Sequence, residues 1–346
     1  MNILTKTFVI VFSLVLFSSC ATWKGTSAGQ LGNRRIAFYN VENLFDTVDD
    51  PAPNDEEFTP ESKKAWTQER YQTKLEHLAK VVAGMDYPAL LGLAEVENAG
   101  VLKDFCEKTS LAKQGYGFCH FESPDFRGID VALLYKKQTF RVLEQAFIRI
   151  DFPAELKGDI PTYTTRDLLV VKGIFGKKDT LNVLVAHLPS RSGGQAETEP
   201  KRIFVARQIR QKVDEIFARN PEANIIIMGD MNDETTDPSI AQMLNALPPV
   251  ERPSPSTLYN CFSKLDAEGQ GTYNYRGTWN MLDHIIFSGN LMGGKARLRF
   301  SKAIIFQQDW MMYTDPKYGK APSRTYGGDH YFGGYSDHLP VMVEVR

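Results

Sequence analysis

ANIIIMGDMND, residues 223–233, is an apolar run that stops abruptly at polar side chains. A continuously apolar run of this length is typical of a β-strand that is buried on both faces. Similar runs follow one another along the chain: RRIAFYN (34–40), ALLGLAEV (89–96), GIDVALLYKK (128–137), DLLVVKGIFG (167–176), DTLNVLVAHL (179–188), LDHIIFSG (282–289) and LPVMVEV (339–345). The sequence therefore predicts a large domain built around buried strands.

Two segments between these strands have the spacing of amphipathic helices, residues 67–85 and 199–220. Their apolar positions are Leu75, Leu78, Val82 and Met85 in the first, and Ile203, Ala206, Ile209, Val213 and Ile216 in the second. An apolar stripe of this kind normally packs against the core. Strands and helices together predict an α/β domain, and 346 residues with 42% apolar side chains are enough to bury a large core.

The N-terminal segment has the features of an export signal. Lys6 precedes an apolar run that is shorter than the roughly 20 residues of a transmembrane helix. LFSSC (16–20) resembles the motif at which bacterial lipoproteins are cleaved and lipidated. We therefore predict a signal peptide at 1–19, a tether at 20–33 that is lipid-anchored through Cys20 on the periplasmic face of a membrane, and one domain at 34–346. A plain signal peptide with an incidental cysteine is the alternative.

Charge and cysteine content narrow the class of protein. The full chain has a net charge of −2, and cleavage of the signal peptide would remove Lys6 and make it −3. A protein that holds nucleic acid on a broad basic face is therefore excluded, but a nuclease that contacts a few phosphates is not. Beyond Cys20 three cysteines remain, and an odd number argues against a disulfide framework. A Cys106–Cys119 bridge and buried free thiols both stay open, and a monomer is the default.

Polar residues gather where the apolar runs stop, and the ends of strands are where α/β proteins bind their ligands. A single carboxylate at such a place is more often a turn or cap residue. Here, however, the set has complementary chemistry and recurs along the chain: Asn40, Glu95, His187, Asp230, Asn232, Asp283, Asp337 and His338. The pattern favours one functional site assembled from several strand ends.

The motifs that carry these residues resemble, in order, those of the endonuclease/exonuclease/phosphatase superfamily. They are YNVENLFD (39–46), GLAEVEN (92–98), VAHLPS (185–190), GDMND (229–233), MLDHIIFS (281–288) and SDHLPV (336–341). The superfamily includes deoxyribonuclease I-like nucleases, exonuclease III-like enzymes, neutral sphingomyelinases and inositol polyphosphate 5-phosphatases. The resemblance spans residues 34–346 and implies a bacterial lipoprotein member. It implies a four-layered sandwich, with two mixed β-sheets packed face to face and helices outside.

The resemblance also implies a metal-dependent phosphodiester hydrolase. Glu95 corresponds to the principal metal ligand, Asn40 offers a neutral oxygen, and Asp337 would orient a second ligand or metal. Oxygen ligands of this kind suit Mg²⁺, with Mn²⁺ as a substitute. We therefore expect Mg²⁺ as the cofactor.

In the resembled family an Asp–His pair assists the attack of water on phosphorus, which assigns Asp283 and His338 to that pair. A carboxylate on one imidazole nitrogen makes the other nitrogen a better base. In a second view of the family, Asp230 activates the water and His338 stabilises the developing charge; the sequence leaves both open. Asn232 would donate to a phosphate oxygen, and His187 would do the same or protonate the leaving oxygen.

Three further matches are looser. Arg166 in TTRDLL and Arg191 after the His187 motif are expected to contact phosphate, although a solvated loop is the alternative for Arg191. Asp130 in RGIDVALLYK is expected to pair with His187.

The sequence leaves three functions open. The leading hypothesis is a nuclease for DNA or RNA outside the cytoplasm. The second is a phosphatase or sphingomyelinase-like phospholipase, for which WMMY (310–313) is the candidate membrane-contacting loop. The third is a catalytically silent binding module. The expected partners are a nucleic acid or another phosphoester, with membrane contact only through Cys20.

Two irregular segments bear on the substrate. The aromatic residues of 307–336 either stack bases or pack the loop onto the domain, and packing is favoured. The acidic segment 47–62 would repel polyanions if it lay near the site.

Overall fold

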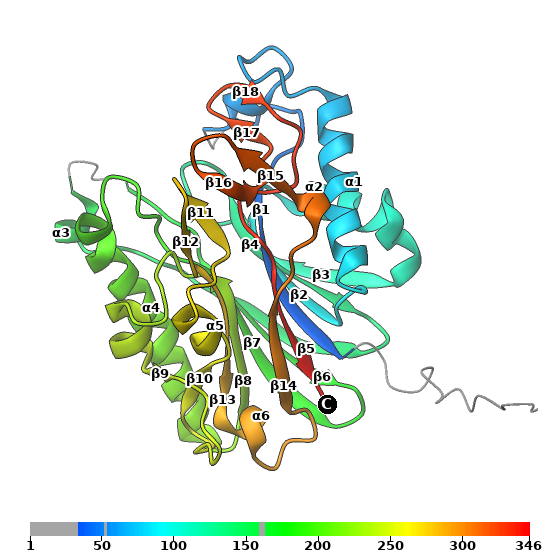
Figure 1. Cartoon of the computed structure of the whole chain (residues 1–346). Helices are drawn as coiled ribbons and strands as arrows, with labels where there is room; N and C mark the ends of the chain where they lie inside the picture. Colours follow the sequence, from blue (N-terminus) through cyan, green and yellow to red (C-terminus); the bar gives the residue numbers. More distant parts are fainter. Residues whose placement is uncertain (1–33, 52–53, 159–162) are drawn as a thin grey trace, which may run out of the picture. The chain divides into compact units, whose positions relative to one another are not determined.

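The computed structural model describes residues 34–51, 54–158 and 163–346, and Figure 1 shows their course. The predicted signal peptide, the tether and Cys20 lie outside the described residues. Among the residues that are described, no helix is both long enough and apolar enough to pass through a bilayer.

Two mixed β-sheets form the centre of the domain (Figure 1). The first has the strand order β14-β19-β1-β2-β4-β3, and the second has the order β5-β6-β7-β8-β13-β10-β9. The first contains β1 (Arg35–Leu44), β2 (Leu90–Val96), β3 (Tyr116–His120), β4 (Asp130–Lys136), β14 (Phe300–Ile305) and β19 (Val341–Val345). The second contains β5 (Phe140–Ile148), β6 (Leu168–Phe175), β7 (Asp179–His187), β8 (Asn224–Asp230), β9 (Ala246–Leu247), β10 (Leu258–Asn260) and β13 (Asp283–Ser288). Every strand predicted above is present.

The other elements are helices, helical turns and small hairpins. The helices are α1 (Gln68–Gly84), α2 (Ala99–Glu107), α3 (Ala154–Lys157), α4 (Gln195–Arg219), α5 (Ser263–Ala267) and α6 (Gly289–Gly293). The helical turns are η1 (Glu56–Phe58), η2 (Ser110–Gln114), η3 (Ser239–Leu244) and η4 (Asp309–Met311). The hairpins are β11 (Tyr273–Tyr275) with β12 (Thr278–Asn280), β15 (Met312–Asp315) with β16 (Gly319–Pro322), and β17 (Tyr326–Gly327) with β18 (His330–Tyr331).

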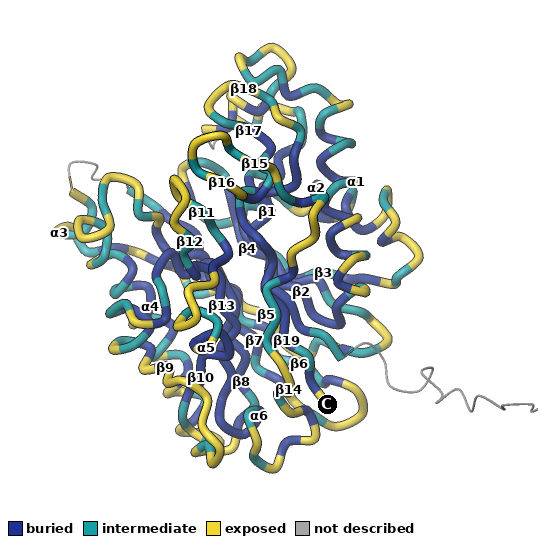
Figure 2. The backbone as a smooth tube through the Cα atoms, in the orientation of Figure 1, coloured by how far each residue is buried: buried dark blue, intermediate teal, exposed yellow. Residues whose placement is uncertain are grey.

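Three clusters of buried side chains define four layers. One cluster lies between the sheets and joins Phe38 and Leu133 of the first sheet to Met228 and Ile285 of the second. Another lies between the first sheet and helices α1 and α2, and the last lies between the second sheet and α4. The central strands of both sheets are dark, and therefore buried, in Figure 2. The predicted four-layered sandwich is confirmed.

Strand β8 shows why the apolar runs are continuous. Successive side chains of a strand point to opposite faces of its sheet. Ile226 and Met228 accordingly enter the cluster between the sheets, while Ile225 and Ile227 enter the cluster under α4. With both faces covered, no position from Ile225 to Met228 is left for a solvated polar side chain.

The two predicted helices form as α1 and α4, but the buried face of α4 is rotated. Ala206, Ile209 and Val213 are buried as expected, whereas Ile203 and Ile216 are only partly buried. Arg202 takes the buried position, with its side chain fully enclosed. Three cysteines, Cys106, Cys119 and Cys261, are buried free thiols, so the alternative Cys106–Cys119 bridge does not form.

Candidate active site

The register of the second sheet brings three of the predicted polar residues together at one end of its central strands. β7 and β8 run parallel, with His187 opposite Asp230, and β13 runs antiparallel to β8, with Asp283 opposite Asp230. The ends of β7 and β8 therefore meet the beginning of β13. His338 precedes β19, and an isolated β-bridge pairs it with Tyr273 at the start of β11.

Asp283 and His338 form the predicted pair. His338 Nδ1 lies 2.7 Å from Asp283 Oδ2, and both residues are buried. Burial lowers the pKa of His338, but the carboxylates of Asp283 and Asp230 outweigh it and raise this pKa well above its usual value. The imidazole is therefore held in its charged form between two carboxylates.

Asp230 is the centre of the site. Its Oδ2 accepts from Asn40 Nδ2 at 3.0 Å, and its Oδ1 accepts from the backbone N–H of Asn232 at 2.9 Å. The same Oδ2 lies 3.5 Å from His187 Nε2 and 3.8 Å from His338 Nε2. Burial is the main cause that raises the pKa of Asp230 to about 7. This carboxylate can therefore exchange a proton near neutral pH.

His187 is the neutral counterpart of His338. Burial, followed by the positive charge of Arg166, lowers the pKa of His187 well below its usual value. Its Nδ1 is buried and has no hydrogen-bond partner among residues 34–51, 54–158 and 163–346. A neutral imidazole in the cleft can donate one hydrogen bond without carrying charge.

The predicted pairing of Asp130 with His187 is wrong. Asp130 begins β4, and its Oδ2 lies 3.0 Å from Nε2 of His120 on the neighbouring strand β3. His187 ends β7 in the other sheet, where Asp230 is its acidic neighbour. The pairing was predicted from short motifs, and a motif does not show to which sheet its strand belongs.

A cleft of about 850 Å³ opens over these residues. Its walls carry five kinds of groups: carboxylates, imidazoles, amides, hydroxyl-bearing side chains and two arginines. The lining residues include Glu95, Arg127, His187, Ser190, Arg191, Asp230, Asn232, Tyr273, Tyr275, Thr278, Asn280, Asp337 and His338. The cleft thus combines groups of both charges with neutral donors, as a site for a phosphate and a cation requires.

The hairpin β11–β12 forms one wall of the cleft and was not anticipated. The Tyr273 ring centroid lies 5.0 Å from that of His338, and Tyr275 is 55% exposed. The strands of this hairpin have three residues each and no apolar run, so periodicity could not detect them. Aromatic side chains on both sides of an RG turn were the available signal.

The three predicted metal ligands occupy different environments. Glu95 lies in the cleft with a positive φ of 65°, and its Oε2 accepts from the backbone N–H of Asn43 at 3.0 Å. Asn40 lies opposite Ala94, the residue before Glu95, on the adjacent parallel strand, and its Oδ1 accepts from the backbone N–H of Glu42 at 3.0 Å. Asp337 also lines the cleft, but its Oδ2 is paired with Arg324 at 2.9 Å. Carboxylate and amide oxygens around Glu95 fit a hard divalent cation.

The two predicted phosphate-binding arginines are both held by protein groups. Arg166 is buried, and it donates to Asp125 Oδ2 at 3.2 Å and to the carbonyl of Leu188 at 2.8 Å. Arg191 lies in the cleft, and its Nε donates to the carbonyl of Asn232 at 2.7 Å. Arg191 is therefore the one of the two that the structure brings to the site.

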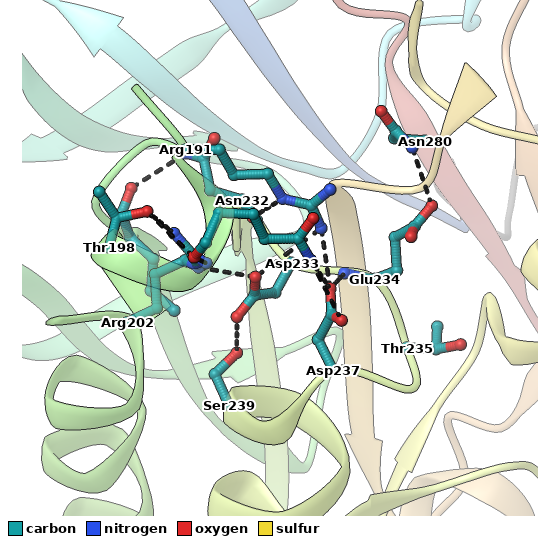
Figure 3. Close-up of polar contacts among 12 residues, drawn as sticks. Arg191, Thr198, Arg202, Asn232, Asp233, Glu234, Thr235, Asp237, Ser239 and Asn280 are labelled. Carbon is teal, nitrogen blue, oxygen red and sulfur yellow. Dashed lines mark hydrogen bonds and ion pairs between the residues drawn. The ribbon is translucent and has the colours of Figure 1, made fainter. Parts of the chain in front are cut away.

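Ion pairs and hydrogen bonds between side chains fix the loop that follows β8 (Figure 3). Asp233 accepts from Arg202 Nε at 2.6 Å and from Ser239 Oγ at 2.7 Å. Arg191 bridges the carbonyl of Asn232 to Asp237 Oδ2, the latter at 2.8 Å. This network explains why Arg202 is buried on α4, and it fixes Asn232 with a positive φ of 50°.

A second buried pair supports the segment that carries His338. Lys74 Nζ on α1 donates to Thr325 Oγ1 at 2.6 Å and to the carbonyl of Tyr335 at 2.7 Å. Glu42 accepts from the backbone N–H of Thr325 at 2.6 Å and lies 4.0 Å from Lys74. Burial raises the pKa of Glu42 to about 7 and lowers that of Lys74 to about 8. Neither residue was identified from the sequence.

Comparison with known proteins gives a family match and several similar structures. A model of the Endonuclease/Exonuclease/phosphatase family matches residues 35–346. No curated protein matches the chain.

Three solved structures illustrate the similarity of fold. The catalytic domain of human Nocturnin with a bound sulfate anion is 19% identical, with a TM-score of 0.55 over 90% of this chain and 92% of that one. A mannosyl-6-phosphatase from Bacteroides thetaiotaomicron is 17% identical, with a TM-score of 0.54 over 90% and 99%. TDP2 from D. rerio, complexed with a single-strand DNA product, is 15% identical, with a TM-score of 0.53 over 90% and 98%.

Proposed function

Because the chain belongs to the endonuclease/exonuclease/phosphatase family, we propose that it is a Mg²⁺-dependent phosphodiester hydrolase, and specifically a nuclease that acts on DNA or RNA outside the cytoplasm. Family members are generally phosphoesterases that depend on a divalent metal. The observation that carries the proposal is the chain of groups from Asp283 through His338 to Asp230, which ends in the cleft.

The proposed reaction begins with water that donates its proton to Asp230 Oδ2 as its oxygen attacks phosphorus. A base is most effective when its pKa lies near the working pH, and that of Asp230 is about 7. His338 stays protonated because Asp283 and Asp230 raise its pKa, and its charge stabilises the developing negative charge on phosphate. The bond from phosphorus to the leaving oxygen then breaks, and that oxygen takes a proton from water in the cleft.

Neutral donors complete the phosphate site. Asn232 donates one amide hydrogen to the carbonyl of Leu188 at 3.0 Å and keeps a second for a phosphate oxygen. Neutral His187 donates a hydrogen bond to another oxygen of the phosphate. Donors that are fixed before reaction stabilise the transition state more effectively than mobile ones.

Glu95, with Asn40 beside it, would hold the Mg²⁺. The ion, when bound, neutralises charge on the phosphate and on the leaving oxygen. Asn40 also donates to Asp230, so one side chain links the metal site to the base. Asp337 is paired with Arg324 and is left in a supporting role.

Two features favour a nucleic acid over a lipid. Tyr275 presents an exposed ring on the cleft wall, which suits an unpaired base. In the candidate membrane loop Met311 is buried and the Trp310 ring lies 5.0 Å from that of Tyr335, so Tyr313 alone is left as an exposed aromatic ring. Tyr326 and Tyr335 join the core under α1, so these two rings pack the loop onto the domain and are not available to stack on bases.

A small phosphate ester is the second candidate substrate. The acidic segment 47–62 begins directly after Asp46, whose backbone N–H donates to Glu97, two positions after Glu95. Negative charge there limits the length of a polyanion that the cleft accommodates. A silent binding module is disfavoured, because binding alone would not require the complete set from Glu95 to His338.

The location remains a proposal from the sequence. The apolar run after Lys6 and the LFSSC motif support export and a lipid anchor at Cys20. We retain the periplasmic face of a membrane as the proposed site, and a monomer as the proposed state.

The experiment that tests this function follows phosphoester cleavage by the purified chain with Mg²⁺ and with EDTA. Substrates are single-stranded and plasmid DNA, RNA, sphingomyelin, and inositol and sugar phosphates. His338→Ala should lose activity, while His330→Ala, a change at an exposed histidine, should keep it. Cleavage of nucleic acid that requires metal and His338 supports the nuclease. Turnover of the small phosphates alone assigns the second candidate, and inactivity on all substrates contradicts the enzyme.

A further inference from the structure

We propose that Asp50, Asp55 and Glu97 bind a second divalent cation, Ca²⁺, at a site separate from the catalytic cleft. One carboxylate oxygen of each residue lies within 4.8 Å of those of the other two. Three like charges so close together repel one another strongly unless a cation or protons compensate them.

The backbone holds these carboxylates together. β1 and β2 are parallel neighbours, so the loops that follow them leave the same edge of the sheet. Glu97 Oε2 accepts from the backbone N–H of Asp46 at 2.6 Å, which fixes it at the beginning of the acidic loop. Further along, the N–H of Asn54 donates to the carbonyl of Phe126 at 2.8 Å, and that of Asp50 donates to Asp55 Oδ2 at 3.2 Å.

The most direct sign of a cation site is on Asp55. This residue is 2% exposed, and its Oδ1 has no hydrogen-bond partner in the described part of the chain. Glu97 is 3% exposed. None of the ion pairs formed by described residues includes either of them or Asp50. Buried carboxylates normally have hydrogen bonds, an ion pair or a metal, so the free oxygen of Asp55 points to a cation.

A hollow of about 590 Å³ beside the cluster gives an ion access and room for water ligands. Asp50, Glu97 and Glu122 line it, as does Asp125, which is paired with Arg166 and Arg127. Asp55 lies behind this lining, and no lysine or arginine is part of it. It has no lining residue in common with the catalytic cleft. The acidic hollow therefore attracts cations independently of the catalytic site.

The donor set favours Ca²⁺. Ca²⁺ accepts roughly six to eight oxygen ligands in irregular geometry, often from carboxylates of a loop, whereas Mg²⁺ prefers one or two carboxylates and keeps several waters. The cluster contains only carboxylates, which excludes the histidine and thiolate ligands that transition metals prefer. Three carboxylates, two on a loop and one after a strand end, match the ligand preference of Ca²⁺.

The test measures the melting temperature of the purified full chain during a Ca²⁺ titration after chelation. Glu95→Gln is the background, so that a cation in the catalytic cleft does not contribute. Saturating Ca²⁺ should raise the melting temperature by a few degrees. Asp55→Asn should abolish this rise, and Asp49→Asn, at an exposed position of the same loop, should keep it.

The direction in which Asp55→Asn changes the stability without metal distinguishes a cation site from an ordinary structural role. In EDTA, Asp55→Asn should be at least as stable as its parent, because it replaces a buried carboxyl that then has no cation to compensate it. If Asp55→Asn does not fold, Asp50→Asn is measured in the same way.

The proposal is overturned if Ca²⁺ does not raise the melting temperature of the background, or raises it equally in Asp55→Asn and Asp50→Asn. An equal rise with Mg²⁺ at the same concentration overturns the choice of Ca²⁺. Because the measurement is stability, none of these outcomes depends on the catalytic function.

Discussion

Asp283 acts through another residue, since its carboxylate contacts His338 and does not line the cleft. Asp283→Asn should lower kcat by roughly 10²–10⁴-fold, because the imidazole loses the charge that keeps it protonated and oriented. It should also shift the pH profile, since the pKa of His338 falls when its main raising carboxylate is removed. The measurement is kcat against pH for the wild type and the variant. A profile that is only scaled down, with unchanged midpoints, would contradict this role.

At the scale of elements, Lys74 of α1 holds the segment that ends in His338. Lys74→Met should lower the free energy of unfolding by about 3–5 kcal/mol, because Glu42 would stay buried with no cation. Adding Glu42→Gln should restore part of that loss, since no unpaired charge then remains. Urea unfolding of the two single variants and the double variant measures this coupling. Strictly additive losses would show that the two residues do not act as a pair.

Edge elements and buried charges are where the sequence was least informative. Central strands such as β8 were predictable because both of their faces are covered. The edge strand β5 has mostly exposed side chains, so it has no apolar run to detect. Arg202 replaces Ile203 on the buried face of α4, because Asp233, distant in sequence, provides its partner.

In the candidate site too, features that depend on local sequence were predictable, and contacts between distant segments were not. The Asp283–His338 pair was predictable because each of the two residues lies in a recognisable motif. The partner of Asp130 was not, since it depends on which strands share a sheet. The Lys74–Glu42 pair also joins elements far apart in the chain, and no motif marks it.

For the whole molecule, stability without metal should fall as the pH rises from about 6.5 to 8. Burial raises the pKa of Glu97 to about 8 and those of Glu42 and Asp230 to about 7. A carboxyl whose folded pKa exceeds its unfolded value stabilises the fold while it is protonated, and this stabilisation is lost as pH rises through the folded pKa. Each extra proton held by the folded state contributes about 1.4 kcal/mol per pH unit.

Buried neutral histidines oppose this trend only at lower pH. Burial lowers the pKa values of His187 and His284, so they destabilise the fold as the pH falls below about 6.5. Melting temperatures in EDTA at pH 6.5 and 8.0 test the prediction. Glu97→Gln should reduce the difference, and a wild type that is equally or more stable at pH 8.0 would contradict it.

The most direct test of the central claim is the activity of Asp230→Asn. Asp230 contacts Asn40 and Asn232 and lies beside both histidines of the cleft, and in the proposed reaction it takes the proton of water. Its amide replacement keeps the shape but cannot accept that proton. The measurement is kcat/KM with Mg²⁺ on the phosphoester that the wild type cleaves best, with the melting temperature as a check on folding. A folded variant with a loss of roughly 10²-fold or more agrees with the account; a folded variant within about threefold of the wild type contradicts it.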